Sequence, residues 1–365
     1  MSLPPLPIPQ YVELPHELLS LRAQIDPVNT LNTIHIIHSY IDLLFAHVKD
    51  ISDGATVETL LSAASQEKFS SSLPWKNIPT YINFSDWTIN NEIEMATFLL
   101  SLLYIHQTHL LPITSNVQIN NHLKQAQSIL MCLKKSPMNN LLETQIQLTV
   151  ISKNIIDVHT SMMEQCGILK VPDKVGTFVK ITIGILNDFT TLKNTWPWDG
   201  WHIWENSMEV LLCFYLSCQS WDKDEVGMAV SYSNCALLLL LEDNFDKLKI
   251  KSSKEGKLSN FKSKFQKGTI NDKKLQRGKI KSKFMLPGVQ NLLEMVLDLL
   301  NIMHVKFTKS NDTINFQKVY SKDQILKDFL LSSSLPSGLK VPNNTKPYLP
   351  PCLAGSKNNY NDAYY

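Results

Sequence analysis

Glycine is scarce in this sequence, long apolar runs are missing, and the six cysteines form no Cys-x-x-Cys pair. The 12 glycines in 365 residues argue against an all-β or glycine-loop architecture. The longest apolar run, Ala236–Leu241, is only about a third of a membrane span. Several cysteines lie within apolar stretches, so we expect reduced, buried thiols of a cytosolic protein and no disulfide or zinc framework.

The common catalytic motifs are also missing. The sequence has no phosphate-binding glycine loop, no dinucleotide-binding fingerprint and no nucleophile elbow, so we expect no enzyme and no cofactor. His35/His38 and His106/His109 are spaced as metal ligands on one helix face can be. Neither pair has a glutamate in His-Glu-x-x-His register, so we expect no metal site.

Apolar residues recur at three-and-four spacing through most of the chain, which predicts a mainly α fold. Short turns between long helices indicate an array of helical hairpins, and we find no regular 34-residue repeat. We expect an extended Pro-rich segment at 1–16, a helical domain at 17–350 and a tail at 351–365. Helices are predicted at about 27–48, 56–69, 90–111, 117–135, 139–165, 173–194, 201–220, 224–248, 287–308 and 322–331.

One segment differs from the rest in composition. Residues 247–283 contain 14 Lys and Arg against two acidic residues, although the net charge of the whole chain is +2. We predict a flexible basic insert at 249–284. It is either a solvated insert or a surface that attracts an anionic membrane or an acidic partner. In the second case the attracting residues are Lys262, Lys264, Lys267, Lys273, Lys274, Arg277, Lys279, Lys281 and Lys283.

Four tryptophans lie within nine residues, at Trp196, Trp198, Trp201 and Trp204. Such a group can form an aromatic cage for a cationic ligand. Alternatively, Trp201 and Trp204 begin the next helix and are buried at a helix–helix corner.

Several segments follow one another in an order typical of one family. They are Tyr40-Ile-Asp-Leu-Leu44, Phe84-Ser-Asp-Trp87 with Glu92–Tyr104, His122–Lys134, and Trp204–Ala236. Together they resemble the BRO domain of the ALIX-type ESCRT-associated proteins, although Ser101 stands where that family has Asn. The resemblance covers about residues 27–345 and implies a banana-shaped helical array with a tetratricopeptide-like solenoid core.

The end of the sequence suggests a group within that family. The chain lacks the coiled-coil V domain of ALIX-like members, and Cys352 lies too far from the end to be prenylated. Leu335-Pro-Ser-Gly338 and Lys346-Pro-Tyr-Leu-Pro-Pro351 are similar to the ending of the stand-alone fungal PalC group. This resemblance implies a non-enzymatic, cytoplasmic adaptor of alkaline-pH signalling, recruited to endosomal membrane or plasma-membrane cortical sites. The alternative is a generic helical-repeat scaffold or a multivesicular-body sorting factor that binds another peptide.

The resemblance also implies a partner and a site. BRO domains bind the C-terminal helix of an ESCRT-III subunit of the Snf/CHMP type in an apolar groove, and pH-signalling components would be further partners. No nucleic acid is expected at a net charge of +2. Four of the matching positions have the spacing of a helix-binding stripe, which is also the spacing of an ordinary core stripe. The matching positions are Ile168, Leu169, Val175, Phe178, Val179 and Ile183.

Overall fold

A computed structural model describes most of the chain, and every structural statement below concerns these residues. They are 6–10, 12–26, 28–52, 56–69, 74–77, 87–111, 115–131, 138–164, 171–196, 198–241, 280–284, 286, 288–330, 335–341 and 345–353.

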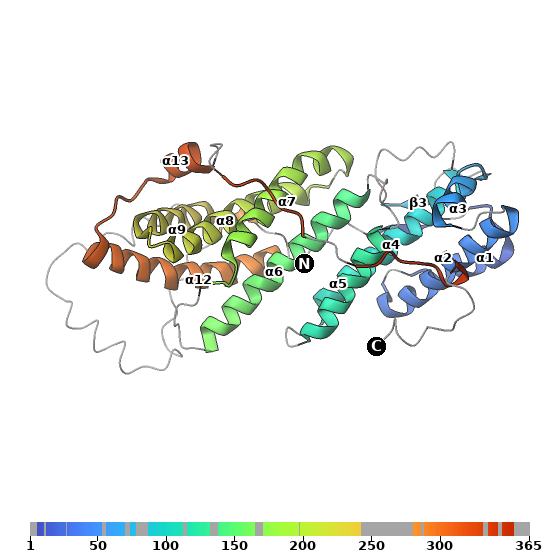
Figure 1. Ribbon diagram of the computed structural model, residues 1–365, viewed down its shortest axis with the longest axis horizontal. Coiled ribbons are helices and arrows are strands. Elements are labelled where there is room, and N and C mark those ends of the chain that lie inside the picture. Colours follow the sequence, from blue (N-terminus) through green and yellow to red (C-terminus); the bar gives the residue numbers. More distant parts are fainter. Residues whose placement is uncertain are drawn as a thin grey trace. The chain divides into compact units, whose positions relative to one another are not determined.

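The described part of the chain is mainly helical, which confirms the predicted fold class (Figure 1). Two short antiparallel pairs accompany the helices: β1 (Ile8–Pro9) with β3 (Trp75–Lys76), and β2 (Lys68–Phe69) with β4 (Trp87–Thr88). The helices are α1 (His16–Arg22), α2 (Thr30–Ile51), α3 (Val57–Ala64), α4 (Ile89–Leu110), α5 (Asn116–Leu130), α6 (Met138–Glu164), α7 (Val175–Thr195), α8 (Gly200–Asp222), α9 (Val226–Leu240), α12 (Val289–Ser310) and α13 (Lys322–Gln324).

Most helix bounds agree with the predicted ones to within a few residues, one predicted helix is too long, and one helix was not predicted. The predicted helix at 56–69 ends early, at Ala64, because Lys68 and Phe69 pair with Thr88 and Trp87 in a two-stranded ladder. Helix α1 was not predicted, since seven residues directly after Pro15 are too few to show a clear period.

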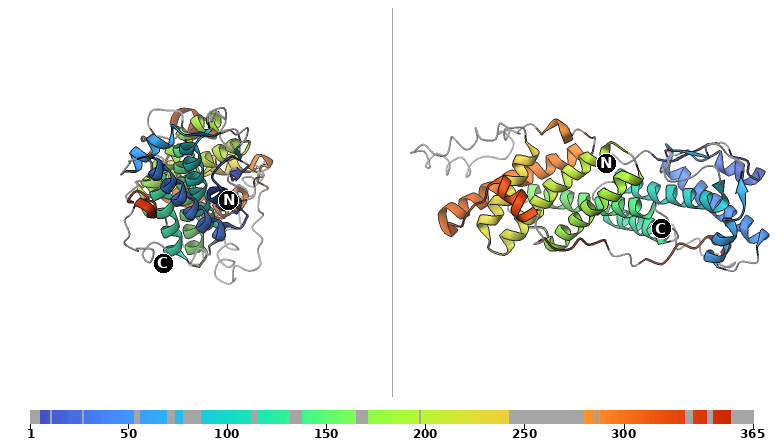
Figure 2. Two further views of the ribbon diagram at one scale, coloured as in Figure 1. Left: turned by 90° about the vertical axis from the view of Figure 1, so that its right-hand side faces the viewer. Right: turned by 90° about the horizontal axis from the view of Figure 1, so that it is seen from above.

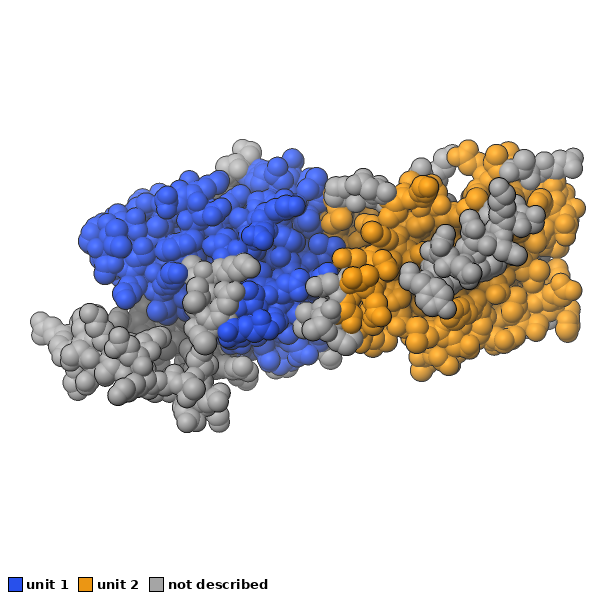
Figure 3. All heavy atoms as spheres, turned by 60° about the horizontal axis from the view of Figure 1, so that its bottom comes forward, with its two compact units in different colours: residues 1–2, 150–187, 199–339 blue, residues 3–149, 188–198, 340–365 orange. Residues whose placement is uncertain are grey.

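The chain forms two compact units (Figure 3). Unit 1 contains residues 150–187 and 199–339, and unit 2 contains residues 3–149, 188–198 and 340–365. The boundary falls within α6 and within α7, so neither unit is a continuous stretch of sequence. The sequence-based division at residues 16 and 350 stays a prediction.

In unit 1, α8 packs against α9, and α12 packs against both (Figures 1 and 2). Trp221 of α8 stacks on Phe307 of α12, with ring centroids 4.6 Å apart. Trp201 and Trp204 are 1% and 0% exposed, which confirms the helix-corner interpretation for these two indoles. Cys213, Cys218 and Cys235 are free thiols buried in the same core.

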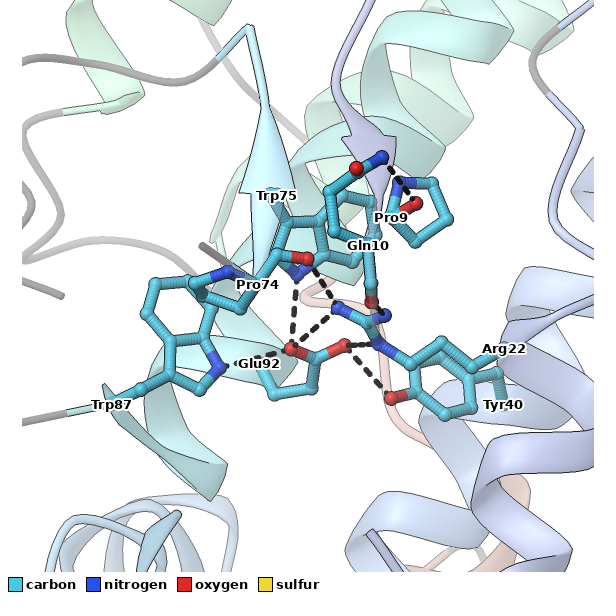
Figure 4. A network of polar contacts seen from close by, with 8 residues as sticks. All are labelled: Pro9, Gln10, Arg22, Tyr40, Pro74, Trp75, Trp87 and Glu92. Carbon is cyan, nitrogen blue, oxygen red and sulfur yellow. Dashed lines mark hydrogen bonds and ion pairs between the residues drawn. The ribbon is translucent and has the colours of Figure 1, made fainter. Parts of the chain in front are cut away.

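Unit 2 contains a polar cluster around one buried carboxylate (Figure 4). Glu92 of α4 is fully buried and accepts hydrogen bonds from Arg22 Nε at 2.6 Å and Tyr40 Oη at 2.8 Å. Its other oxygen accepts the indole N–H groups of Trp75 at 2.9 Å and Trp87 at 3.0 Å. Four segments of the chain therefore converge on one side chain.

Arg22 extends this cluster to the first strand. Its guanidinium also donates to the carbonyl oxygens of Gln10 and Pro74, which flank the β1–β3 pair. Both carboxylate oxygens of Glu92 accept hydrogen bonds. A buried ion pair is stable only if its polar atoms are bonded in this way. The cluster thus fixes the N-terminal segment on α1, α2 and α4.

Candidate partner-binding site

The predicted groove residues of α7 face the core of the protein. Val175, Val179 and Ile183 are 6%, 0% and 8% exposed. Phe178 is half-buried and stacks on Tyr215 of α8, with centroids 5.5 Å apart. The apolar stripe of α7 is therefore already covered by neighbouring helices. Its role in binding a partner stays a prediction, and two of its proposed members, Ile168 and Leu169, lie outside the described residues.

The next face of α7 opens on a pocket of about 710 Å³. Helices α7, α8 and α9 and the extended segment 335–339 line it, and all of them belong to unit 1. On the α7 side it is lined by Gly176, Thr177 and Lys180, each of which is next in sequence to a residue of the predicted stripe. A shift of one residue turns a side chain by about 100° around a helix, which separates the core-facing set from the pocket-facing set.

The floor of the pocket has both apolar and polar side chains, and its rim is basic. Leu216 and Tyr232 are largely buried in the floor, Met228 is partly exposed beside them, and the polar Gln219 and Ser220 complete it. Four exposed charged side chains line the rim, three of them cationic: Lys174, Lys180, Lys223 and Glu225.

The extended segment 335–339 forms one wall of the pocket. Leu335, Pro336 and Leu339 line it, and the Leu339 amide donates to the Lys180 carbonyl at 2.9 Å. The wall lies unusually close to α7, because a Cβ at Gly184 would be 2.7 Å from the Leu339 carbonyl oxygen. A Cβ at Gly338 would in turn be 2.8 Å from the Gly184 Cα. Two glycines in contact therefore allow the crossing that builds this wall.

The rim is set by two residues in left-handed backbone conformations. Lys174, with φ of 57°, precedes α7, and its carbonyl accepts the Thr177 amide at 2.8 Å. Asp224, with φ of 59°, lies in the turn between α8 and α9, where the Glu225 amide donates to the Ser220 carbonyl at 2.8 Å. Non-glycine residues in this region are uncommon, and they concentrate where a loop has to place particular side chains.

Most of the predicted basic surface lies outside the described residues, from Lys262 to Lys279. Lys281 Nζ donates to the Leu238 carbonyl at the end of α9, at 2.8 Å. Lys283 Nζ donates to Asn206 Oδ1 of α8 at 2.8 Å, and partial burial lowers the pKa of Lys283. These two lysines thus hold the end of the insert on α8 and α9, and the attraction of a membrane or acidic partner stays a prediction.

One of the four histidines considered as metal ligands, His38, has tyrosine neighbours. Both ring nitrogens of His38 contact tyrosine hydroxyls, Tyr104 at 2.9 Å and Tyr348 at 3.2 Å. The described residues contain no group of three or more His, Cys, Asp or Glu placed to hold a metal ion. Among the same residues, no helix has both the length and the apolar character needed to cross a membrane.

The pocket suits a particular kind of ligand. The apolar side chains of its floor favour apolar anchors, and a rim with three lysines and one glutamate favours acidic side chains. The fold and the pocket therefore define a mainly helical protein with a pocket that is lined by three exposed lysines in unit 1.

Comparison with known proteins gives a family for this chain. It belongs to a family of unknown function, DUF5355, which matches residues 100–365. A comparison with curated proteins finds no match. A solved structure described as the "Structure basis for endosomal targeting by the Bro1 domain" has 14% sequence identity and a TM-score of 0.44, over 90% of this chain and 81% of that chain.

Proposed function

We propose that this protein is a non-enzymatic adaptor that binds an amphipathic helix of a partner in the pocket beside α7. The observation that carries this proposal is the group of apolar side chains in the pocket floor beside the three exposed lysines Lys174, Lys180 and Lys223. A groove of this kind takes up anchors spaced along one face of a helix. The basic rim speeds association with an acidic segment and discriminates against basic ones.

The partner that we propose is the C-terminal helix of an ESCRT-III subunit of the Snf/CHMP type. The ordered BRO-like segments, from Tyr40-Ile-Asp-Leu-Leu44 to Trp204–Ala236, support this choice. The Leu335-Pro-Ser-Gly338 ending supports the alkaline-pH signalling pathway as the setting, at endosomal or plasma membranes. This ending also has a structural role, because Gly338 is one of the two glycines that allow the pocket wall.

Binding of a fluorescent ESCRT-III C-terminal helix, followed by anisotropy, tests the proposal. Thr177→Glu places a negative charge in the pocket, and Thr191→Glu places one on an exposed part of α7 that does not line it. We expect Thr177→Glu to weaken binding by about tenfold and Thr191→Glu to leave it unchanged. An acidic residue in the first turn of α7 is compatible with the helix dipole, so Thr177→Glu is expected to fold.

The same titration separates this function from its alternatives. If the helix does not bind the wild-type protein at all, the ESCRT-III assignment is wrong. If it binds and both variants retain full affinity, the partner is right and the pocket is not its site. If unrelated acidic helices bind equally well, the protein is a general helix-binding scaffold.

A further inference from the structure

Two large apolar side chains are exposed at the end of α12. Ile314 is 74% exposed and Phe316 is 75% exposed, and both follow directly on the helix. They belong to a π-helical turn, Asn311–Asn315, and to the residue that ends it. We call residues 311–319 the α12 tip. Single exposed apolar residues are common on protein surfaces, whereas two in one short turn need an explanation.

The backbone of the α12 tip is held in an unfavourable conformation. Phe316 has φ of 52°, in the left-handed region that bulky residues rarely adopt. Its amide donates to the Asn311 carbonyl at 2.7 Å. The Asn311 side chain bonds both the amide and the carbonyl of Gln317, each at 3.0 Å. A strained conformation persists only where its surroundings fix it in this way.

The α12 tip is also fastened to α9. The Gln317 side chain accepts from the Gly227 amide at 2.8 Å and donates to the Asp224 carbonyl at 3.0 Å. A Cβ at Gly227 would lie 2.4 Å from the Lys318 carbonyl oxygen, so only glycine allows this approach. The Tyr320 amide donates to Ser231 Oγ at 2.8 Å. The chain therefore presents Ile314 and Phe316 on a rigid base.

The segment around the α12 tip has a local excess of lysines, which the neighbouring turn offsets. Residues 305–319 contain three lysines, Lys306, Lys309 and Lys318, and one acid, Asp312. Lys318 Nζ lies over the Tyr320 ring at 4.6 Å. Asp222 at the end of α8 and the turn that follows it add three acids and one lysine, so this end of unit 1 is close to neutral. Apolar contact must then supply most of any affinity.

The size of the apolar surface decides between a membrane and a protein. An aromatic side chain offers about 150–250 Å², so two residues that are three quarters exposed present about 300 Å². A standard protein interface buries about 800 Å² from each partner, of which about 450 Å² is apolar. Insertion of a few apolar side chains beside lysines is, in contrast, the usual way in which a protein surface attaches to the lipid interface. We propose that the α12 tip inserts Ile314 and Phe316 into the interface of an anionic lipid membrane.

Membrane contact at this end has a consequence for the pocket. Gln317 of the α12 tip bonds Asp224, and the flanking residues Lys223 and Glu225 line the pocket. A protein attached through the α12 tip would hold the pocket close to the lipid surface, where a membrane-bound partner helix lies. This consequence rests on the proposed function, whereas membrane insertion does not depend on it.

Cosedimentation of the full chain with vesicles of phosphatidylcholine and phosphatidylserine tests the insertion. We expect Ile314→Ser with Phe316→Ser to lower the partition coefficient by about tenfold or more, at both low and high salt. Val117→Ser, on α5, is the matched control, because Val117 is 74% exposed and belongs to unit 2, whereas the α12 tip belongs to unit 1. High salt screens any attraction of the membrane by the basic insert. A fall in the partition coefficient that persists at high salt therefore reports insertion of the apolar side chains.

A second variant reports insertion directly and does not depend on lost binding. Phe316→Trp keeps an aromatic residue, and brominated lipids should quench its fluorescence more than that of the wild-type protein. The proposal is overturned if the double serine variant partitions like the wild type, or if Phe316→Trp gains no quenching. It is also overturned if the serine variant changes only self-association in ultracentrifugation, since the α12 tip would then contact a second copy of the chain.

Discussion

The Glu92 cluster of unit 2 and the pocket of unit 1 use charged side chains in opposite ways. In the cluster, Arg22 and Glu92 are 3% and 0% exposed, and their charges are matched within the protein. At the pocket, Lys174, Lys180 and Lys223 are exposed to solvent around a floor that includes apolar side chains. A charge that is buried and paired stabilises one conformation, whereas a charge that is exposed beside apolar surface is available to a partner. The first region therefore contributes to stability, and the second has the features that the proposed recognition needs.

The largest effect is expected at the centre of the cluster. Glu92→Ala leaves the Arg22 guanidinium buried without its carboxylate and removes the acceptor of Tyr40, Trp75 and Trp87. We expect the free energy of unfolding to fall by about 3–5 kcal/mol in urea titration. Glu164→Ala, at the exposed end of α6, should change it by less than about 0.5 kcal/mol. Equal losses in the two variants would show that the cluster contributes little.

A somewhat smaller loss is expected in the covered stripe of α7. Val179→Asp buries a carboxylate without a partner at a position that is 0% exposed, so we expect a loss of about 3 kcal/mol. Thr177→Asp, two residues earlier and exposed, should be neutral. Calorimetry of both variants measures the difference. A stable Val179→Asp protein would mean that the stripe opens in solution, and would restore it as a groove.

The pH dependence of stability is expected to report on His38. Desolvation by burial, with a smaller contribution from His35, lowers the pKa of His38 from 6.5 to about 4. The folded state thus keeps the imidazole neutral while the unfolded chain takes up a proton. The stabilisation is complete above pH 6.5 and decreases by up to about 3 kcal/mol as the pH falls to about 4. Unfolding of the wild type and of His38→Gln across this range measures it, and parallel pH profiles would contradict it.

The smallest effects are expected at two glycines of α7. Gly184→Ala places a Cβ 2.7 Å from the Leu339 carbonyl oxygen, so the pocket wall must move, at a cost of about 1–2 kcal/mol. Gly176→Ala meets only the flexible end of Gln219, at 3.0 Å, and should gain up to about 1 kcal/mol from helix propensity. Thermal unfolding separates the two. If Gly176→Ala lowered the stability as much as Gly184→Ala, the close contact between α7 and the pocket wall would not be the cause of the loss.

Helix positions could be predicted well from the sequence, because apolar spacing depends on local geometry. The period along α2 and α4 fixes their extents to within a few residues. The same period could not show whether the α7 stripe faces a partner or the core, because both need one apolar face. That decision depends on Tyr215 and other groups far away in the sequence.

The pocket and the cluster depend on long-range contacts that no local pattern shows. The pocket wall forms because Gly338 meets Gly184, more than a hundred residues earlier in the chain. Glu92 was visible in a BRO-like segment, yet its partners Arg22, Tyr40 and Trp75 come from separate segments. In the sequence, isolated glycines and a glutamate within an apolar helix indicated that these positions are unusual. They did not indicate which residues contact them.

Hydrogen–deuterium exchange of the whole chain, with and without the ESCRT-III C-terminal helix, tests the central claim most directly. The account predicts slower exchange in the first turn of α7, in the turn between α8 and α9 and in residues 335–339, where the helix would cover the pocket. Exchange around Glu92 should not change. Protection confined to other regions, or no protection at saturating helix, would contradict the assignment of recognition to this pocket.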